Sequence, residues 1–249
     1  DVYFYDIAKR VGVDRIAEMA NLLGLGSKTG IELPSEKGGL IPTRAWKKAL
    51  IGTPWQQGET LISGIGQGFI LTTPLQLAVM VARIANGAKA VAPRLIRPAG
   101  VDGKNDDPVF KPLGISQRSL DIVREGMNRV TNMQGGSAYR ARIVDEGMEM
   151  SGKTGTAQVS RISKAERDSR VLKNHERLWR ERDHALFVGF APSHNPRYAA
   201  AVVVEHGGGG SAVAAPIARD LLIATQKRDP GNREEAPGNP KAPAKSEEI

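Results

Sequence analysis

The run that begins at Ser151 concentrates groups that can bind an anion. It contains the cation Lys153, the hydroxyls of Thr154 and Thr156, and Gly155, which carries no side chain. A cation beside hydroxyl and backbone donors can hold a carboxylate or a phosphate, and can stabilise an oxyanion during acyl transfer. The run therefore predicts an anion site, and acyl transfer and nucleotide binding are the two chemistries to separate.

A phosphate-binding loop is the first interpretation. Residues Gly147 to Thr154 match the pattern G-x-x-x-x-G-K-[ST]. Such a loop needs a helix that opens at Lys153 within a parallel sheet, whereas Gly155 and the β-branched threonines disfavour a helix there. Glu149 would also place a carboxylate in the phosphate nest. We therefore rank nucleotide binding far below the other interpretations.

An ordinary edge strand is the second interpretation, because a Lys-Thr-Gly tripeptide is weak information by itself.

Acyl transfer through a serine is the third interpretation. That reaction needs a cation to hold the substrate carboxylate and to keep a neighbouring lysine neutral, and amide donors where the oxyanion develops. Lys153 would supply the charge, Thr154 and Thr156 the hydroxyls, and Gly155 would let a substrate approach the strand closely.

Composition narrows the classes of function. The 249 residues include no cysteine and only four scattered histidines, which argues against disulfides, a cysteine nucleophile and a metal site, so no cofactor is expected. A formal net charge of +8 favours an anionic polymer or a membrane surface, and the scarcity of aromatic residues places nucleic acid last. The absence of an initiating Met suggests a piece of a longer protein.

Four helices are expected from capping residues and apolar spacing. They begin at Asp14, at Thr73-Pro74 and near Ser116, and a last one covers 212–224. In the helix after Ser116, Leu120, Val123, Met127 and Val130 share helical spacing. In the last helix, Ile217, Leu221 and Leu222 are expected to face a sheet. Residues 24–45 hold several glycines and two prolines, which predicts a loop.

Three short β-rich runs predict the sheet. They cover residues 155–159, 185–190 and 198–205. The link between the last two runs is short, so these strands should form an antiparallel hairpin and not a parallel pair with a helical crossover.

Two polar segments lie outside this pattern. Residues 161–183 carry eight arginines and lysines against five acidic residues, and we interpret them as a solvated insertion in preference to a binding patch. From residue 227 the chain is rich in Pro, Gly, Ala, Lys and Glu without an apolar period. We therefore expect a folded region over 1–226 and a disordered tail over 227–249.

Five separated segments resemble one family in the order in which that family carries them. They are residues 25–34, 42–47, 64–68, 72–76 and 153–159. The last is similar to the K-T-G box of penicillin-binding proteins. Together the segments resemble the transpeptidase domain of class B penicillin-binding proteins, in particular penicillin-binding protein 2.

The resemblance implies a fold and a reaction. The fold would be mixed α/β, with a central antiparallel sheet flanked by helices, and the reaction would be a serine D,D-transpeptidation that cross-links peptidoglycan stem peptides and is blocked by β-lactams. Lys153, Thr154, Gly155 and Thr156 would bind substrate, and the Thr156 amide would donate to the oxyanion. Asp1 resembles the third residue of the family's S-x-N box. Segments 64–68 and 72–76 would form a tight turn and a helix start.

The resemblance also implies parts that this sequence does not show. The nucleophilic serine, its lysine partner and the first strands of the domain would precede Asp1, so this polypeptide alone would be inactive and its last strand would have an unpaired edge. An N-terminal anchor in the cytoplasmic membrane, a domain on its outer, periplasmic side and a SEDS-type glycosyltransferase partner are likewise expected. A serine β-lactamase and a non-catalytic β-lactam sensor of the same fold stay open as alternatives.

Overall fold

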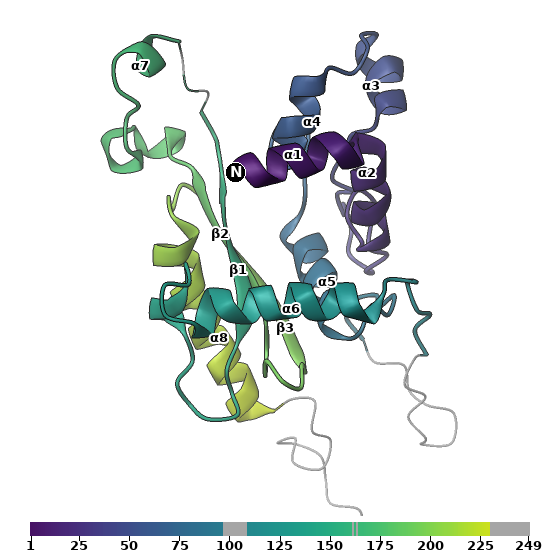
Figure 1. Cartoon of the computed structure of the whole chain (residues 1–249). Coiled ribbons are helices and arrows are strands. Elements are labelled where there is room, and N and C mark those ends of the chain that lie inside the picture. The colour runs from purple at the N-terminus through teal and green to yellow at the C-terminus, as the bar shows by residue number, and fades with distance from the viewer. Residues whose placement is uncertain (97–108, 161, 163, 230–249) are drawn as a thin grey trace, which may run out of the picture.

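A three-stranded antiparallel sheet lies between helices in the computed structural model, which describes residues 1–96, 109–160, 162 and 164–229 (Figure 1). The strands are β1 Ser151–Ala157, β2 His184–Ala191 and β3 Tyr198–Val204. The α-helices are α1 Val2–Val11, α2 Val13–Leu22, α3 Arg44–Ile51, α4 Gln57–Ser63, α5 Pro74–Ala85, α6 Gln117–Asn132, α7 Lys164–Asp168 and α8 Ala215–Arg228. The expected mixed α/β fold is therefore confirmed.

The sheet has the order β1-β2-β3, and the hairpin predicted for its last two strands is confirmed. Within the described part of the chain, β1 and β3 each have one unpaired edge. The first strand begins at Ser151, four residues before its predicted start, because Gly152 lies opposite Gly189 in the register. The two glycines make room for the ring of Phe187, and an added Cβ at Gly152 would lie 2.2 Å from its Cζ atom.

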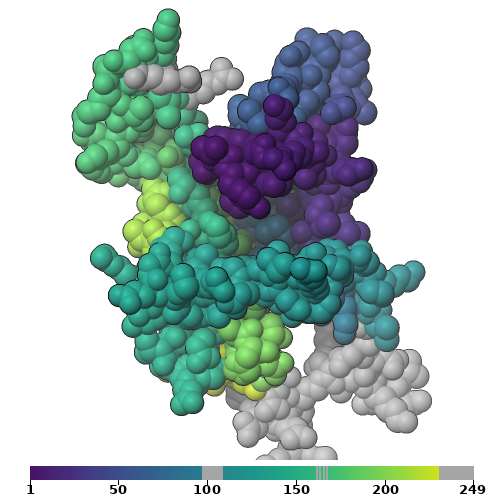
Figure 2. Space-filling view, viewed as in Figure 1, coloured from purple at the N-terminus to yellow at the C-terminus, as the bar shows by residue number. Residues whose placement is uncertain are grey.

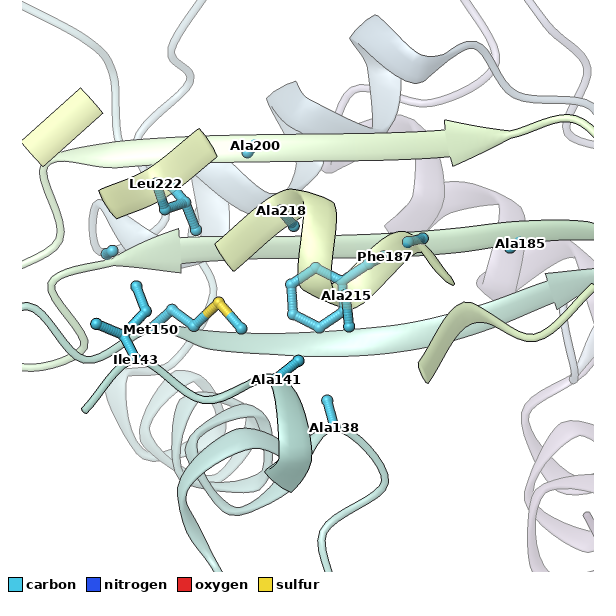
Figure 3. Packing of buried hydrophobic residues seen from close by; sticks show 12 residues of the cluster. Ala138, Ala141, Ile143, Met150, Ala185, Phe187, Ala200, Ala215, Ala218 and Leu222 are labelled. Carbon is cyan, nitrogen blue, oxygen red and sulfur yellow. The ribbon is translucent and has the colours of Figure 1, made fainter. Parts of the chain in front are cut away.

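Helices cover both faces of the sheet. Side chains alternate along β2, so this strand contributes apolar residues to both faces. Phe187 points to the face that α8 covers, where it packs with Met150, Ala215 and Leu222 (Figure 3). Phe190 points to the opposite face and packs with residues of α5 and α6. The sheet is therefore a two-sided core, and β1 reaches out of that core at its later residues.

The helix α8 faces the sheet with residues other than those predicted. Ala215, Ala218 and Leu222 are buried, whereas Ile217 and Leu221 are 47% and 49% exposed. Residues 215, 218 and 222 share one helical face, and the two alanines let the helix backbone approach the strands closely. The prediction for Leu222 is confirmed, and those for Ile217 and Leu221 are wrong.

The start of α5 confirms its predicted capping. The Thr73 hydroxyl accepts a hydrogen bond from the Gln76 amide, and the Gln76 side chain accepts one from the Thr73 amide. Gln76 is fully buried, and its Nε2 donates to the carbonyls of Ser27 and Gly38, both at 2.7 Å. The predicted loop 24–45, whose last two residues begin α3, is thus fastened to α5 by one side chain.

The helices predicted near Ser116 and at Asp14 are both present, as α6 and α2, and each differs from its prediction in one detail. Ser116 caps α6, and Leu120 and Met127 are buried as expected, whereas Val123 is 46% exposed. The predicted helix at Asp14 begins one residue earlier, at Val13. Asp14 does not cap it: one of its carboxylate oxygens accepts a hydrogen bond from the Arg44 amide at 3.0 Å, which satisfies a free N–H at the start of α3.

The two polar segments are described in part. Residues 164–183 form α7 and short 3₁₀ turns, with ion pairs between Arg177 and Glu166 and between Arg170 and Glu176. Helix α8 continues through Arg228, so it includes the first two residues of the predicted tail. Asp229 is also described and pairs with Arg197, and residues 230–249, on which most of that prediction falls, lie outside the described residues. No helix in the described ranges has both the length and the apolar character of a membrane span.

Candidate active site

Three of the predicted site residues lie together on the unpaired edge of β1. Lys153 donates from Nζ to the Thr154 carbonyl at 2.8 Å, and the Gln67 side chain donates from Nε2 to the Thr156 carbonyl at 3.1 Å. The Thr154 hydroxyl lies 3.1 Å from the Ser137 hydroxyl. Side chains from two other segments, Gln67 and Ser137, therefore meet this strand.

The backbone of Thr154 and Thr156 faces away from β2. In an antiparallel pair, opposed residues alternate between pairs that exchange both backbone hydrogen bonds and pairs that exchange none. The carbonyls of Thr154 and Thr156 are bonded by side chains outside the sheet, which places both residues in the second class. Their N–H groups consequently point to the free edge, where an extended ligand could pair with them.

Lys153 carries the positive charge of this edge. Among the described residues, no carboxylate forms an ion pair with its ammonium group, which donates to the Thr154 carbonyl. Loss of water around the group lowers the pKa of Lys153 from its ordinary value of 10.5. A cation that lacks a carboxylate partner and is partly desolvated is suited to attract the carboxylate of a ligand.

Neither the backbone conformation nor the packing of this chain requires a glycine at position 155. Its backbone does not have a positive φ, and an added Cβ would approach only the Cβ of Leu186, at 3.3 Å. Gly152 differs, because a Cβ there would collide with the Phe187 ring and with the Val188 carbonyl. The glycine at 152 serves the core, whereas the one at 155 leaves space on the accessible part of the strand.

A groove of about 660 Å³ continues from the end of β1. Ile62 and Ser63 of α4 and the following Gln67 line one side, and Gln158 and Ser160 line the other. The segment 164–183 and the helices α1 to α4 lie on either side of this end of the sheet in Figure 1, and Figure 2 shows the same parts in space-filling form. The groove offers amides, hydroxyls and apolar side chains to a ligand that extends beyond Thr156.

Asp1 is not joined to this constellation. It is exposed, it precedes the first residue of α1, and its carbonyl accepts a hydrogen bond from the Tyr5 amide. No hydrogen bond or ion pair in the described ranges connects it to Lys153, Thr154 or Thr156. The structure thus brings together the predicted residues of β1, and in the described ranges Asp1 is bonded to its own helix α1.

Sequence reasoning missed Gln67 and Ser137. Gln67 stands in the segment Gly64-Ile65-Gly66-Gln67-Gly68, which was expected to form a tight turn and does so, with positive φ values of 75° and 81° at Gly66 and Gly68. The glycines signalled the turn, but nothing in the sequence indicated that its glutamine reaches a strand 89 positions later. Ser137 follows α6, and no motif marked it.

The phosphate-loop interpretation does not fit this geometry. Lys153 and Thr154 lie inside the antiparallel strand β1, which continues to Ala157, so no helix opens at Lys153 to direct its amides and its dipole at a phosphate. The low rank given to nucleotide binding is confirmed.

Comparisons with known proteins point to one family. The penicillin binding protein transpeptidase domain matches residues 1–223. The peptidoglycan D,D-transpeptidase MrdA of Haemophilus influenzae is 35% identical over 228 residues, which cover 89% of this chain and 34% of that protein. MrdA of Escherichia coli K12 is 35% identical over 207 residues, which cover 82% of this chain and 32% of that protein.

Solved structures agree with these matches. The chain is 37% identical to Pseudomonas aeruginosa PBP2 in complex with WCK 5153, with a TM-score of 0.71, covering 91% of this chain and 44% of that one. It is 30% identical to Helicobacter pylori PBP2 in complex with MreC, with a TM-score of 0.76, covering 91% of this chain and 38% of that one. The chain spans about a third of the length of the curated relatives. It belongs to the penicillin-binding protein transpeptidase family.

Proposed function

We propose that the protein to which this chain belongs is a peptidoglycan D,D-transpeptidase of the penicillin-binding protein 2 type. The observation that carries the proposal is the free edge of β1, where Lys153 has no carboxylate partner among the described residues and the backbones of Thr154 and Thr156 face outward. The identity of 35% to MrdA proteins over most of this chain supports the same reaction.

In the proposed reaction, a serine hydroxyl attacks the carbonyl carbon between the two terminal D-alanines of a stem peptide. The C–N bond breaks, the last D-alanine leaves with a proton on its amine, and an ester joins the peptide to the serine. The amine of a second stem peptide then attacks the ester, forms the cross-link and frees the serine. We propose that the serine and its lysine partner are supplied by a segment that precedes Asp1.

The residues of β1 would take three roles in this reaction. The Lys153 ammonium would attract the terminal carboxylate of the stem peptide and help to keep the neighbouring lysine neutral. The Thr154 hydroxyl would donate to the same carboxylate, and Gly155 would leave room for the peptide. The Thr156 N–H would donate to the oxyanion. Asp1 would complete the S-x-N box once the residues before it are in place.

β-Lactams and the elongation machinery are the proposed partners. A penicillin resembles the D-Ala-D-Ala terminus and would acylate the same serine. The relatives from P. aeruginosa and H. pylori were solved with WCK 5153 and with MreC. Another relative belongs to a peptidoglycan synthase complex that couples polymerisation and cross-linking. We propose a SEDS-type glycosyltransferase as a partner and an anchored location at the outer side of the cytoplasmic membrane.

A labelling experiment tests the proposal. The protein in its full length and the chain 1–249 would each be incubated with a fluorescent penicillin, and covalent label would be measured after denaturation. We expect label on the full-length protein, much slower labelling after Lys153→Ala, and no label on the chain alone. Absence of label on the full-length protein would contradict transpeptidase function and favour a different role of the fold. Rapid turnover of nitrocefin would favour a serine β-lactamase.

A further inference from the structure

The contact between Gln67 and Thr156 links two parts of the molecule across the groove. Gln67 lies in the turn between α4 and α5, and its Nε2 donates to the Thr156 carbonyl on the free edge of β1. Both Gln67 and the continuation of β1 line the groove. A single side-chain amide therefore supports the strand at the residue whose N–H is proposed to bind the oxyanion.

Thr156 needs such support because of its place in the sheet. It is the second-last residue of β1, and after Ala157 the strand leaves its pairing with β2. The neighbouring residues of the strand bond to β2, so β2 holds this part of the strand along one edge only. In an extended strand the N–H and the carbonyl of one residue point to the same side, so a bond that holds the Thr156 carbonyl at the free edge favours the same direction for its N–H.

Gln67 is itself held in place. Its backbone amide donates to the Ile62 carbonyl at 3.1 Å, and the glycines on both sides have left-handed backbone conformations that set the path of the turn. At the end of α4, an added Cβ on Gly64 would lie 2.3 Å from the Cβ of Ala8, so α4 packs directly against α1. The donor thus projects from a turn that is fixed on a helix pair.

We propose that Gln67 is a positioning residue of the transpeptidase site: its side-chain amide holds the Thr156 carbonyl and thereby orients the Thr156 N–H toward the oxyanion. This role rests on the proposed function. A carbonyl oxygen has two lone pairs, so the bond from Gln67 leaves the second one available to an amide of the ligand. Gln67 touches no reacting atom, and it acts through Thr156.

The test compares acylation by a fluorescent penicillin in the full-length protein and its variants. Gln67→Ala removes the donor, and Gln67→Glu keeps the shape but places a carboxylate oxygen against the carbonyl. We expect the first-order acylation constant to fall about 10-fold in Gln67→Ala and further in Gln67→Glu, since small misplacements of catalytic groups cost this much or more. The dissociation constant of the complex before acylation should change less than about 3-fold. Gln57→Ala, an exposed glutamine on α4, is the matched control.

The outcomes separate this role from a purely structural one. A melting temperature close to the wild-type value with a slow acylation step supports positioning. Unchanged acylation in Gln67→Ala, or a loss found only in the dissociation constant or in the melting temperature, overturns it while transpeptidase function stands. A wild-type protein that takes no label would instead overturn the proposed function, and the two failures are thereby distinguished.

Discussion

The ammonium group of Lys153 lies 2.8 Å from the carbonyl oxygen of Thr154, the next residue of the same strand. This cation is bonded to its own backbone and, in the described ranges, has no carboxylate partner. It contributes little to the cohesion of the fold, and a ligand carboxylate could take it over by a small rotation of the side chain. Lys153 is therefore a residue of the site and not of the core.

Replacing Lys153 by alanine should abolish function and preserve the fold. We expect penicillin acylation of the full-length protein to fall at least about 100-fold, because the main cation for the ligand carboxylate is lost. The melting temperature should shift by less than about 2 °C, since substitutions away from packed features have small effects. Labelling rates and circular dichroism melts would be measured together, and a large loss of stability would contradict this interpretation.

Gly152→Ala should lower the stability of the protein much more than Gly155→Ala does. The methyl group at 152 would collide with the Phe187 ring and the Val188 carbonyl, which should destabilise the protein by about 2–4 kcal/mol. At 155 the methyl group needs only a small adjustment of Leu186, so the free energy of unfolding should change by less than about 1 kcal/mol.

Acylation distinguishes the two variants further. Gly155→Ala should be slowed because its methyl group narrows the approach to β1, and urea unfolding with labelling rates measures both properties. If Gly155→Ala were fully active, the proposed approach of the ligand along this strand would be wrong.

The acylation rate should fall as the pH rises through the pKa of Lys153. Desolvation lowers that pKa below 10.5, so the side chain loses its charge at a lower pH than an ordinary lysine does, and the neutral amine no longer attracts a carboxylate. In Lys153→Arg the guanidinium keeps its charge, and the basic limb of the pH–rate profile should move to higher pH. Identical basic limbs in the two proteins would show that another group controls this limb.

The same shift makes a prediction for stability. A lysine whose pKa is lowered by folding favours unfolding while it is charged, so its cost is fully present below the folded pKa and disappears as the pH rises above the unfolded value. Lys153→Met should therefore be somewhat more stable than the wild type at neutral pH, and the difference should shrink toward pH 10.5. Denaturation curves at several pH values measure this, and a difference that grows with pH would contradict it.

Gln76 should be a major determinant of stability although it is polar. Its Nε2 satisfies the carbonyls of Ser27 and Gly38, and it is fully buried. Gln76→Ala leaves buried carbonyls without donors and opens a cavity, which should cost about 2–4 kcal/mol. Gln117→Ala, on the exposed face of α6, is the control and should cost less than about 0.5 kcal/mol. Equal stability of the two variants, measured by urea unfolding, would show that loop 24–45 is held by other contacts.

Local signals in the sequence were sufficient for features that depend on near neighbours. The capping hydroxyl and proline at Thr73-Pro74, the helix start near Ser116 and the turn around Gly66 were all predicted, because each involves hydrogen bonds or backbone conformations within a few residues. The hairpin of β2 and β3 was predicted for the same reason, from its short link. The order of motifs around Lys153 also indicated the family, which the comparisons confirm.

Only the tertiary structure decided the features that depend on distant residues. The strand β1 extends back to Ser151 because Gly152 meets Gly189 under the Phe187 ring, although serine, glycine and lysine have little preference for strands. Helix α8 turns its alanines to the sheet, and Asp14 serves the start of α3. The bond from Gln67 to Thr156 spans 89 positions, and sequence spacing carries no information about such a contact, because packing of whole elements sets the distance between its two ends.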